Sequence, residues 1–324
     1  MSGNHRGRRA NTIAAVTADS VTKQPAESLD FDIAIASFIR QCRVKNLTDE
    51  TLKYYRNVLR SLKDLMYEQG ITRPIDVRSE HVGECILMRQ ESGVVDITVN
   101  TFVRGWRAFF NHAYNEGHIT ENVGAGIKLI KAERRVIETF TKDQLRRLLD
   151  APEKTTFTGY RNYVVLLTLL DTMIRISELE GIRLRSINWR DRTITVMGKG
   201  RKERVVPFQN TLEKHLQEYI NIRGPLDHDF LFVNIDNNPL KKRSIQQTIA
   251  GLGKEAGIQG VRCSPHTIRH TGAKMYIMRG GDVFSLQKIL GHTSLDVVKL
   301  YVSLWGTDVA EKHRRHSPLE GLFE

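Results

Sequence analysis

Hydrophobic residues recur every three or four positions through almost all of residues 29 to 130. A period near 3.6 residues places these side chains on one face of a helix and does not fit a strand, in which alternate residues share a face. The pattern therefore predicts an all-α domain of four or more amphipathic helices. Four segments carry it: FDIAIASFIRQC at 31–42, TDETLKYYRNVLRSLKDLMYEQG at 48–70, SEHVGECILMRQES at 79–92 and TVNTFVRGWRAFFNHAYNEG at 98–117.

The second half of the chain mixes two periodicities. The segment SINWRDRTITVMGKGRKERVVPF at 186–208 alternates as strands do, with turn residues at Asp191 and at Gly-Lys-Gly 198–200. This alternation predicts a small antiparallel sheet, and helical patterns surround it, so residues 141–318 are expected to form a mixed α+β, mainly helical domain. The helical segments are YRNYVVLLTLLDTMIRISELEGI at 160–182, RSIQQTIAGLGKEAG at 243–257, TIRHTGAKMYIMRGG at 267–281, VFSLQKILG at 283–291 and SLDVVKLYVSL at 294–304.

The boundary between these two domains is predicted at residues 131–140. This stretch, KAERRVIETF, is basic and shows little apolar periodicity. Thr141 then opens the sequence TKDQ, which is typical of a capping box at a helix start. The first 28 residues are predicted to be a flexible basic tail and residues 319–324 a short C-terminal tail, and a length of 324 residues is typical of two domains.

The charge balance indicates a polyanionic partner. Lysine and arginine number 49 against 37 acidic residues, which gives a net charge of +12. A basic domain of this kind favours nucleic acid as its partner. The three cysteines are scattered and form no C-x-x-C pair, and no segment reaches the length of a membrane span, so a cytoplasmic protein with no membrane partner is expected.

The segment SPHTIRH at 264–270 allows two interpretations. His266 and His270 are four residues apart and would share a helix face, as two zinc ligands do. Alternatively, Ser264 and Pro265 are typical of a helix start, which would place His266 and Arg269 where an anion such as phosphate binds. Zinc hydrolases carry a glutamate between such histidines, and this chain does not, so the phosphate interpretation is favoured and no metal is expected.

The residue types found in this half of the chain match the needs of phosphoryl transfer without a metal. Two guanidiniums can hold the nonbridging oxygens of a phosphodiester, a lysine can protonate a leaving alkoxide, and a tyrosine hydroxyl can attack phosphorus. Histidines can transfer protons near neutral pH. The candidate residues are Arg175, Lys199, His266, Arg269, His292 and Tyr301.

The same residues carry a resemblance to a known family. The run from Ser264 to Leu304 resembles the H-x-x-R, L-G-H and tyrosine motifs of the tyrosine recombinases, the phage-integrase and Xer group of site-specific DNA recombinases, in order and at the family's spacing. IRISELEGI at 174–182 resembles the segment with the family's first arginine, and GKGRKERVVP at 198–207 resembles the hairpin with its lysine. The resemblance covers roughly residues 29 to 318 and identifies the first domain as similar to the SAM-like core-binding domain.

The resemblance implies a role for each candidate. Tyr301 is expected to be the nucleophile, Arg175 and Arg269 the phosphate clamp, and Lys199 the acid toward the 5′ oxygen.

The histidines and one carboxylate complete the expected site. The resemblance makes His266 the proton acceptor and His292 a hydrogen-bond donor to phosphate, while His270 is expected to be structural. Glu178, three residues after Arg175, is a candidate to orient that guanidinium. Met173 departs from the family, in which a glycine commonly stands two residues before the first arginine.

The implied function is site-specific recombination of double-stranded DNA through a 3′-phosphotyrosine intermediate and a Holliday junction, with no cofactor. Four identical protomers, or a mixed tetramer with a second recombinase, would assemble on two sites, each C-terminal segment docking on a neighbour. Three other functions stay open: a DNA-binding regulator without catalysis, a metal-dependent nuclease, and a type IB topoisomerase.

Overall fold

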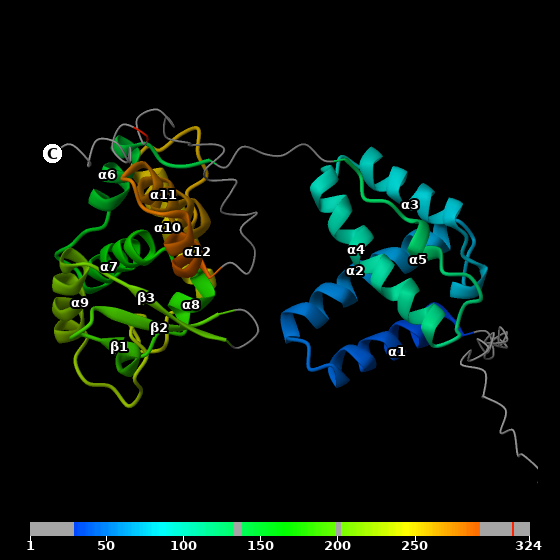
Figure 1. Ribbon diagram of the computed structural model, residues 1–324, viewed down its shortest axis with the longest axis horizontal. Helices are drawn as coiled ribbons and strands as arrows, with labels where there is room; N and C mark the ends of the chain where they lie inside the picture. The colour runs from blue at the N-terminus through cyan, green and yellow to red at the C-terminus, as the bar shows by residue number, and fades with distance from the viewer. Residues whose placement is uncertain (1–28, 132–137, 199–201, 292–312, 314–324) are drawn as a thin grey trace, which may run out of the picture. The chain divides into compact units, whose positions relative to one another are not determined.

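The computed structural model describes residues 29–131, 138–198, 202–291 and 313 (Figure 1). The chain divides into two compact units, Met1–Arg134 and Arg135–Glu324. The first unit is all-α in its described residues, and the second holds helices and one small sheet. The predicted fold class of two domains is confirmed, whereas the predicted boundary residues stay a prediction.

The first unit is a bundle of helices around an aromatic core. Thr48 accepts a hydrogen bond from the N–H of Thr51 and so caps the second helix. The helices are α1 (Phe31–Val44), α2 (Asp49–Glu68), α3 (Ser79–Glu91), α4 (Asp96–Asn115) and α5 (Val123–Gly126), with a 3₁₀ turn at Pro74–Asp76. These ranges confirm the four helices expected from periodicity.

Helices α2 and α4 cross closely because Gly105 has no side chain. A Cβ at Gly105 would lie 2.4 Å from Cγ2 of Val58, so only glycine permits this approach. Beside the crossing, the indole of Trp106 donates to the carbonyl of Val58 at 3.0 Å, and the hydroxyl of Tyr54 donates to the carbonyl of Thr101 at 2.6 Å. These bonds fix the two long helices against each other.

The second unit surrounds a three-stranded antiparallel sheet with helices (Figure 1). The strands β1 (Ile187–Asn188), β2 (Thr193–Met197) and β3 (Glu203–Pro207) lie in that order, and Val196 pairs with Arg204. The predicted hairpins are confirmed in the described residues. The helices are α6 (Lys142–Asp150), α7 (Phe157–Thr172), α8 (Ile176–Glu180), α9 (Asn210–Arg223), α10 (Lys242–Glu255), α11 (Pro265–Met278) and α12 (Val283–Leu290), with a 3₁₀ turn at Leu184–Ser186.

The segment 160–182, which was predicted to be almost wholly helical, forms two helices, α7 and α8, with a break between them. Helix α7 ends because Met173 adopts the left-handed conformation, with φ 51° and ψ 29°. This conformation is unfavourable for a residue with a side chain, which explains why glycine suits the position in the family. Here the buried methionine side chain packs against Ala273, Ile277 and Leu290, and this contact compensates for the backbone cost. The departure noted in the sequence thus preserves a sharp turn before Arg175.

Within the parts of the chain that the structure describes, no helix combines the length and apolar character needed to cross a membrane.

Candidate active site

Arg175 and Arg269 meet at the C-terminal end of α12. Nη2 of Arg269 donates to the carbonyl of Leu290 at 2.7 Å, and Nη2 of Arg175 donates to the carbonyl of Gly291 at 3.2 Å. The last carbonyls of a helix have no partner within the helix and carry its partial negative charge, so they attract cations. The structure therefore brings the two predicted clamp arginines together, although 94 residues separate them in the sequence.

The two guanidiniums differ in their exposure. Arg269 is only 4% exposed, and its Nη1 also donates to the carbonyl of Met173 at 2.7 Å. The left-handed turn at Met173 thus presents a carbonyl to the buried guanidinium. The side chain of Arg175 is 29% exposed and lies closer to solvent. The pair combines a firmly fixed guanidinium with a more accessible one.

Glu178 lies against Arg175, as its spacing predicted. The carboxylate accepts the backbone N–H of Arg175 at 2.7 Å, just before the start of α8, and it also accepts from Nη1 of Arg175 at 3.1 Å. The same carboxylate also forms a two-pronged ion pair with Arg204 on β3: Nη2 donates at 2.8 Å and Nη1 contacts the other oxygen. The contact with Arg175 is established, and the orienting role of Glu178 stays a prediction.

The ion pair keeps Glu178 charged. Burial raises the pKa of Glu178 and is the largest single influence on it. The hydrogen bonds from Arg204 and from the backbone of Arg175, together with the charges of both arginines, outweigh burial and bring the pKa below its ordinary value of 4.5. Glu178 is therefore an anion at neutral pH, and it can hold both arginines electrostatically.

His266 stands in the first turn of α11, near both clamp arginines. Ser264 caps this helix by accepting the N–H of Thr267 at 3.2 Å, which confirms the predicted helix start. Burial is the main cause that lowers the pKa of His266 from its ordinary value of 6.5, followed by the charges of Arg269 and Arg175, and then by another arginine nearby. His266 is therefore neutral at pH 7 and able to accept a proton.

His270 follows one turn later on the same helix. Burial lowers the pKa of His270 to about 4, and the charges of His266 and Arg269 act in the same direction. Both histidines line a cavity of about 830 Å³. Among the residues that the structure describes, no group of three or more His, Cys, Asp or Glu side chains is placed to hold a metal ion.

Three predicted site residues lie outside the described residues: Lys199, His292 and Tyr301. Their predicted roles stay predictions. The described chain reaches Gly198 and Gly291, each of which directly precedes one of them.

Arg204 is the functional candidate that the sequence interpretation missed. Its strand alternates, and Arg204 shares a face with Val206, which is fully buried. A charged residue at an inward strand position requires a buried partner of opposite charge. This pattern is the feature of the sequence that could have identified Arg204. Among the described residues of this site, the guanidiniums of Arg175, Arg204 and Arg269 carry three positive charges, and the carboxylate of Glu178 carries one negative charge. The balance of two positive charges suits an anion such as a phosphodiester.

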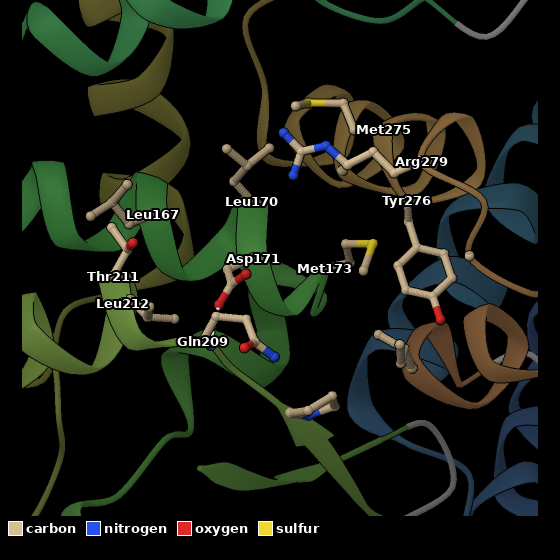
Figure 2. Close-up of a pocket in the computed structure, with 14 residues that line it drawn as sticks. Leu167, Leu170, Asp171, Met173, Gln209, Thr211, Leu212, Met275, Tyr276 and Arg279 are labelled. Carbon is tan, nitrogen blue, oxygen red and sulfur yellow. Dashed lines mark hydrogen bonds between the residues drawn. The ribbon is translucent and has the colours of Figure 1, made fainter.

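A second cavity includes Met173 in its lining. It has a volume of about 580 Å³ and lies among α7, α9, α11 and α12. Figure 2 shows Met173 between Asp171 and Tyr276 in this cavity. Burial raises the pKa of Asp171, and the hydrogen bond from the N–H of Gln209 opposes this effect. Since the carbonyl of Met173 bonds to Arg269, one residue borders both the cavity and the arginines.

Comparison with known proteins gives the family. The profile of the phage integrase family matches residues 138–305, more than half of the chain. The chain is 28% identical over 295 residues to "Tyrosine recombinase XerC" of Oceanobacillus iheyensis, covering 89% of this chain and 96% of the relative. It is 28% identical over 279 residues to "Tyrosine recombinase XerD" of Staphylococcus haemolyticus, covering 85% and 94%.

A solved structure shares the fold. The structure of a lambda integrase tetramer bound to a Holliday junction superposes with a TM-score of 0.70 at 17% identity, over 83% of this chain and 79% of the integrase chain. The resemblance seen in the sequence is confirmed by the family profile. The chain belongs to the phage integrase family and is a site-specific DNA recombinase of the tyrosine type.

Proposed function

We propose that this recombinase cuts and rejoins double-stranded DNA with six residues and without metal ion or ATP. The observation that supports the proposal best is the meeting of Arg175 and Arg269 at the end of α12, with His266 neutral beside them. The six proposed residues are Arg175, Lys199, His266, Arg269, His292 and Tyr301.

The proposed first step conserves the energy of the phosphodiester. The hydroxyl oxygen of Tyr301 attacks phosphorus and gives its proton to His266, while the bond to the 5′ oxygen breaks and that oxygen takes a proton from Lys199. The guanidiniums of Arg175 and Arg269 oppose the growing charge on the nonbridging oxygens. A 5′ hydroxyl from the other DNA site then attacks the phosphotyrosine and releases Tyr301, so no ATP is needed.

Covalent trapping tests this proposal. A nicked DNA site that loses its 5′ fragment after cleavage should accumulate a protein–DNA adduct in buffer with EDTA and without ATP. A metal-dependent nuclease would be inactive in EDTA and form no adduct, and a DNA-binding regulator would bind without cutting. A type IB topoisomerase would relax supercoiled plasmid that lacks any paired site, whereas the recombinase requires two sites for strand exchange.

The proposed assembly is a tetramer on two DNA sites, either of four copies of this chain or with a second recombinase. We propose that apolar side chains from the C-terminal segment of a neighbouring protomer, LWGTDVAEKHRRHSPLEGLFE at 304–324, dock in the 580 Å³ cavity of Figure 2. Leu167, Leu170 and Met275 line this cavity, and Leu304 and Trp305 of the segment offer matching apolar groups. Docking there would act on the Met173 turn and through it on Arg269.

The pH dependence of cleavage should reflect the protonation state of His266. Because the pKa of this histidine lies below 6.5, its neutral form prevails from about that pH upward. We expect kcat/KM, which reflects the free enzyme, to stay level from neutral pH down through 6.5 and to fall only on further acidification. Single-turnover cleavage over a pH series measures this profile. An activity that rises on acidification would mean that His266 works as a cation, and its role as proton acceptor would be abandoned.

The Lys199→Ala variant tests whether Lys199 donates a proton to the leaving oxygen or contributes only its positive charge. The variant is expected to cleave an ordinary phosphodiester poorly, yet to recover much of its rate on DNA with a bridging 5′-thiolate leaving group. A thiolate departs without a proton because it is far less basic than an alkoxide. Arg269→Ala serves as the comparison, since charge stabilisation on nonbridging oxygens is not restored by that substrate. Equal impairment of Lys199→Ala on both substrates would remove its role as an acid.

A further inference from the structure

Arg204 makes three contacts that join separate parts of the second unit. It projects from β3 toward the buried carboxylate of Glu178, which belongs to α8 and is 2% exposed. Its Nη2 and Nη1 contact the two carboxylate oxygens of Glu178. Its Nε donates at 3.1 Å to the carbonyl of Ile289 in the last turn of α12. One planar guanidinium thus ties a strand to two helices, in a geometry that the fork of arginine provides and lysine lacks.

The carbonyls at the end of α12 are shared among three arginines. Ile289 accepts from Arg204, Leu290 accepts from Arg269, and Gly291 accepts from Arg175. The shared end of the helix directly precedes position 292. Arg204 therefore fixes the same helix end as the two clamp arginines, and it does so from the strand side.

Two glycines lie directly against the ion pair of Arg204 and Glu178. Gly291 adopts φ 63°, and a Cβ there would lie 2.8 Å from Nε of Arg204, so the guanidinium occupies the space that a side chain would need. A Cβ at Gly198 would lie 3.5 Å from Nη1 of Arg204 and 3.7 Å from Oε1 of Glu178. Each glycine directly precedes a residue of the proposed site, His292 and Lys199 respectively.

We propose that Arg204, through its ion pair with Glu178, is a positioning residue that holds Arg175 and the chain segments leading to Lys199 and His292 in one arrangement. This inference rests on the proposed function, which gives those three residues their roles. Arg204 touches no reacting atom in this scheme. It acts on the phosphate through Arg175, on Lys199 through Gly198, and on His292 through Gly291.

A role in stability alone would explain these contacts less well. A buried ion pair loses so much hydration that replacing it with packed apolar residues is often neutral or stabilising. Glu178 instead keeps its charge between Arg204 and Arg175, and Arg175 is proposed to act on phosphate. The benefit of such a pair is a defined arrangement, and cleavage depends steeply on arrangement, since a misplacement of about 1 Å can cost about a hundredfold in rate.

Arg204→Lys tests the proposal because it keeps the charge and removes the fork. In single-turnover trapping at saturating DNA, we expect the rate constant of adduct formation to fall at least about tenfold. The fall should stay below about a hundredfold, which is the cost of a misplacement of about 1 Å. The fraction of protein that finally reacts, and the affinity for the site, should stay at wild-type values. A purely structural loss would lower the reacting fraction and the melting temperature, and would leave the rate constant of the folded molecules unchanged.

Arg223→Lys is the matched control. Arg223 is buried, whereas the side chain of Arg204 is 14% exposed. Arg223 donates to three carbonyls at the end of α9, those of Phe230, Gly224 and His228, at 3.1, 2.8 and 2.9 Å. Its replacement should lower the melting temperature and leave the cleavage rate constant intact. If Arg204→Lys behaves in the same way, the positioning role is wrong while the proposed function stands. If the wild-type chain forms no adduct, the proposed function itself fails.

A double variant covers the case in which Arg204→Lys does not fold. Arg204→Gln with Glu178→Gln replaces the ion pair by a neutral amide pair, while Arg175 loses its carboxylate partner but is 29% exposed and keeps its bond to the carbonyl of Gly291. We expect this variant to fold and bind the site but to cleave with a reduced rate constant. Cleavage at the wild-type rate constant would overturn the proposal.

Discussion

Tyr301→Phe is expected to abolish the covalent protein–DNA adduct while leaving the affinity for the recombination site nearly unchanged. The substitution removes only the hydroxyl oxygen, which is the atom proposed to attack phosphorus. The aromatic ring itself is retained. Trapping on a nicked site, resolved in a denaturing gel, measures the adduct, and a mobility-shift titration of the same DNA measures binding.

Tyr163→Phe provides the control for the loss of a phenol in the same unit. The Tyr163 ring packs against His215 and beneath the ammonium of Lys154, and it has no part in the proposed site. This variant should form the adduct at the wild-type rate. An adduct that persists in Tyr301→Phe would assign the nucleophile to another residue, and the role proposed for Tyr301 would be withdrawn.

Local features of the fold could be predicted from the sequence because their causes are local. The helices of the first unit follow from a hydrophobic period that needs no knowledge of distant residues. The starts of α6 and α11 follow from side chains three residues away: Thr141 bonds Gln144 reciprocally, and Ser264 accepts from Thr267. The antiparallel hairpins follow in the same way from alternation and turn residues.

The turn at Met173 and the role of Arg204 could not be predicted in that way. Nothing in the local sequence marks a methionine for the left-handed conformation, and the conformation persists because the side chain is buried among residues of α11 and α12. The contact from Arg204 to Ile289 spans 85 residues, and that from Arg175 to Gly291 spans 116. Such contacts depend on tertiary packing, which the pattern of one strand or helix does not contain.

Arg269→Lys is expected to reduce cleavage by at least about a hundredfold, the usual cost of losing one preorganised donor to the transition state. Arg175→Lys should act in the same direction. Both variants keep the positive charge, so the effect isolates the two-pronged geometry of the guanidinium. Binding of the DNA site should weaken much less, because the chain has 49 lysines and arginines and many of the others can contact the DNA backbone.

The structure gives a reason why lysine cannot replace Arg269. Two separate nitrogens of this buried guanidinium hold the carbonyls of Met173 and Leu290, each at 2.7 Å. A single ammonium at the end of a flexible chain cannot hold the same plane, so both the Met173 turn and the end of α12 would lose a fixed partner. The loss should therefore appear in the rate constant of cleavage, and a smaller part of it in the melting temperature.

Arg161→Lys is a control that separates a loss of cleavage rate from a loss of stability. Arg161 is likewise buried in the second unit and donates to the carbonyl of Val233 at 3.1 Å, away from the proposed site. Its replacement should lower the melting temperature without changing the single-turnover rate constant. Arg269→Lys should lose rate constant far beyond any loss of folded protein, because the guanidinium is proposed to stabilise charge that develops only as the phosphodiester is cut. Near-normal cleavage by folded Arg269→Lys would remove this residue from the clamp and leave Arg175 to hold the phosphate alone.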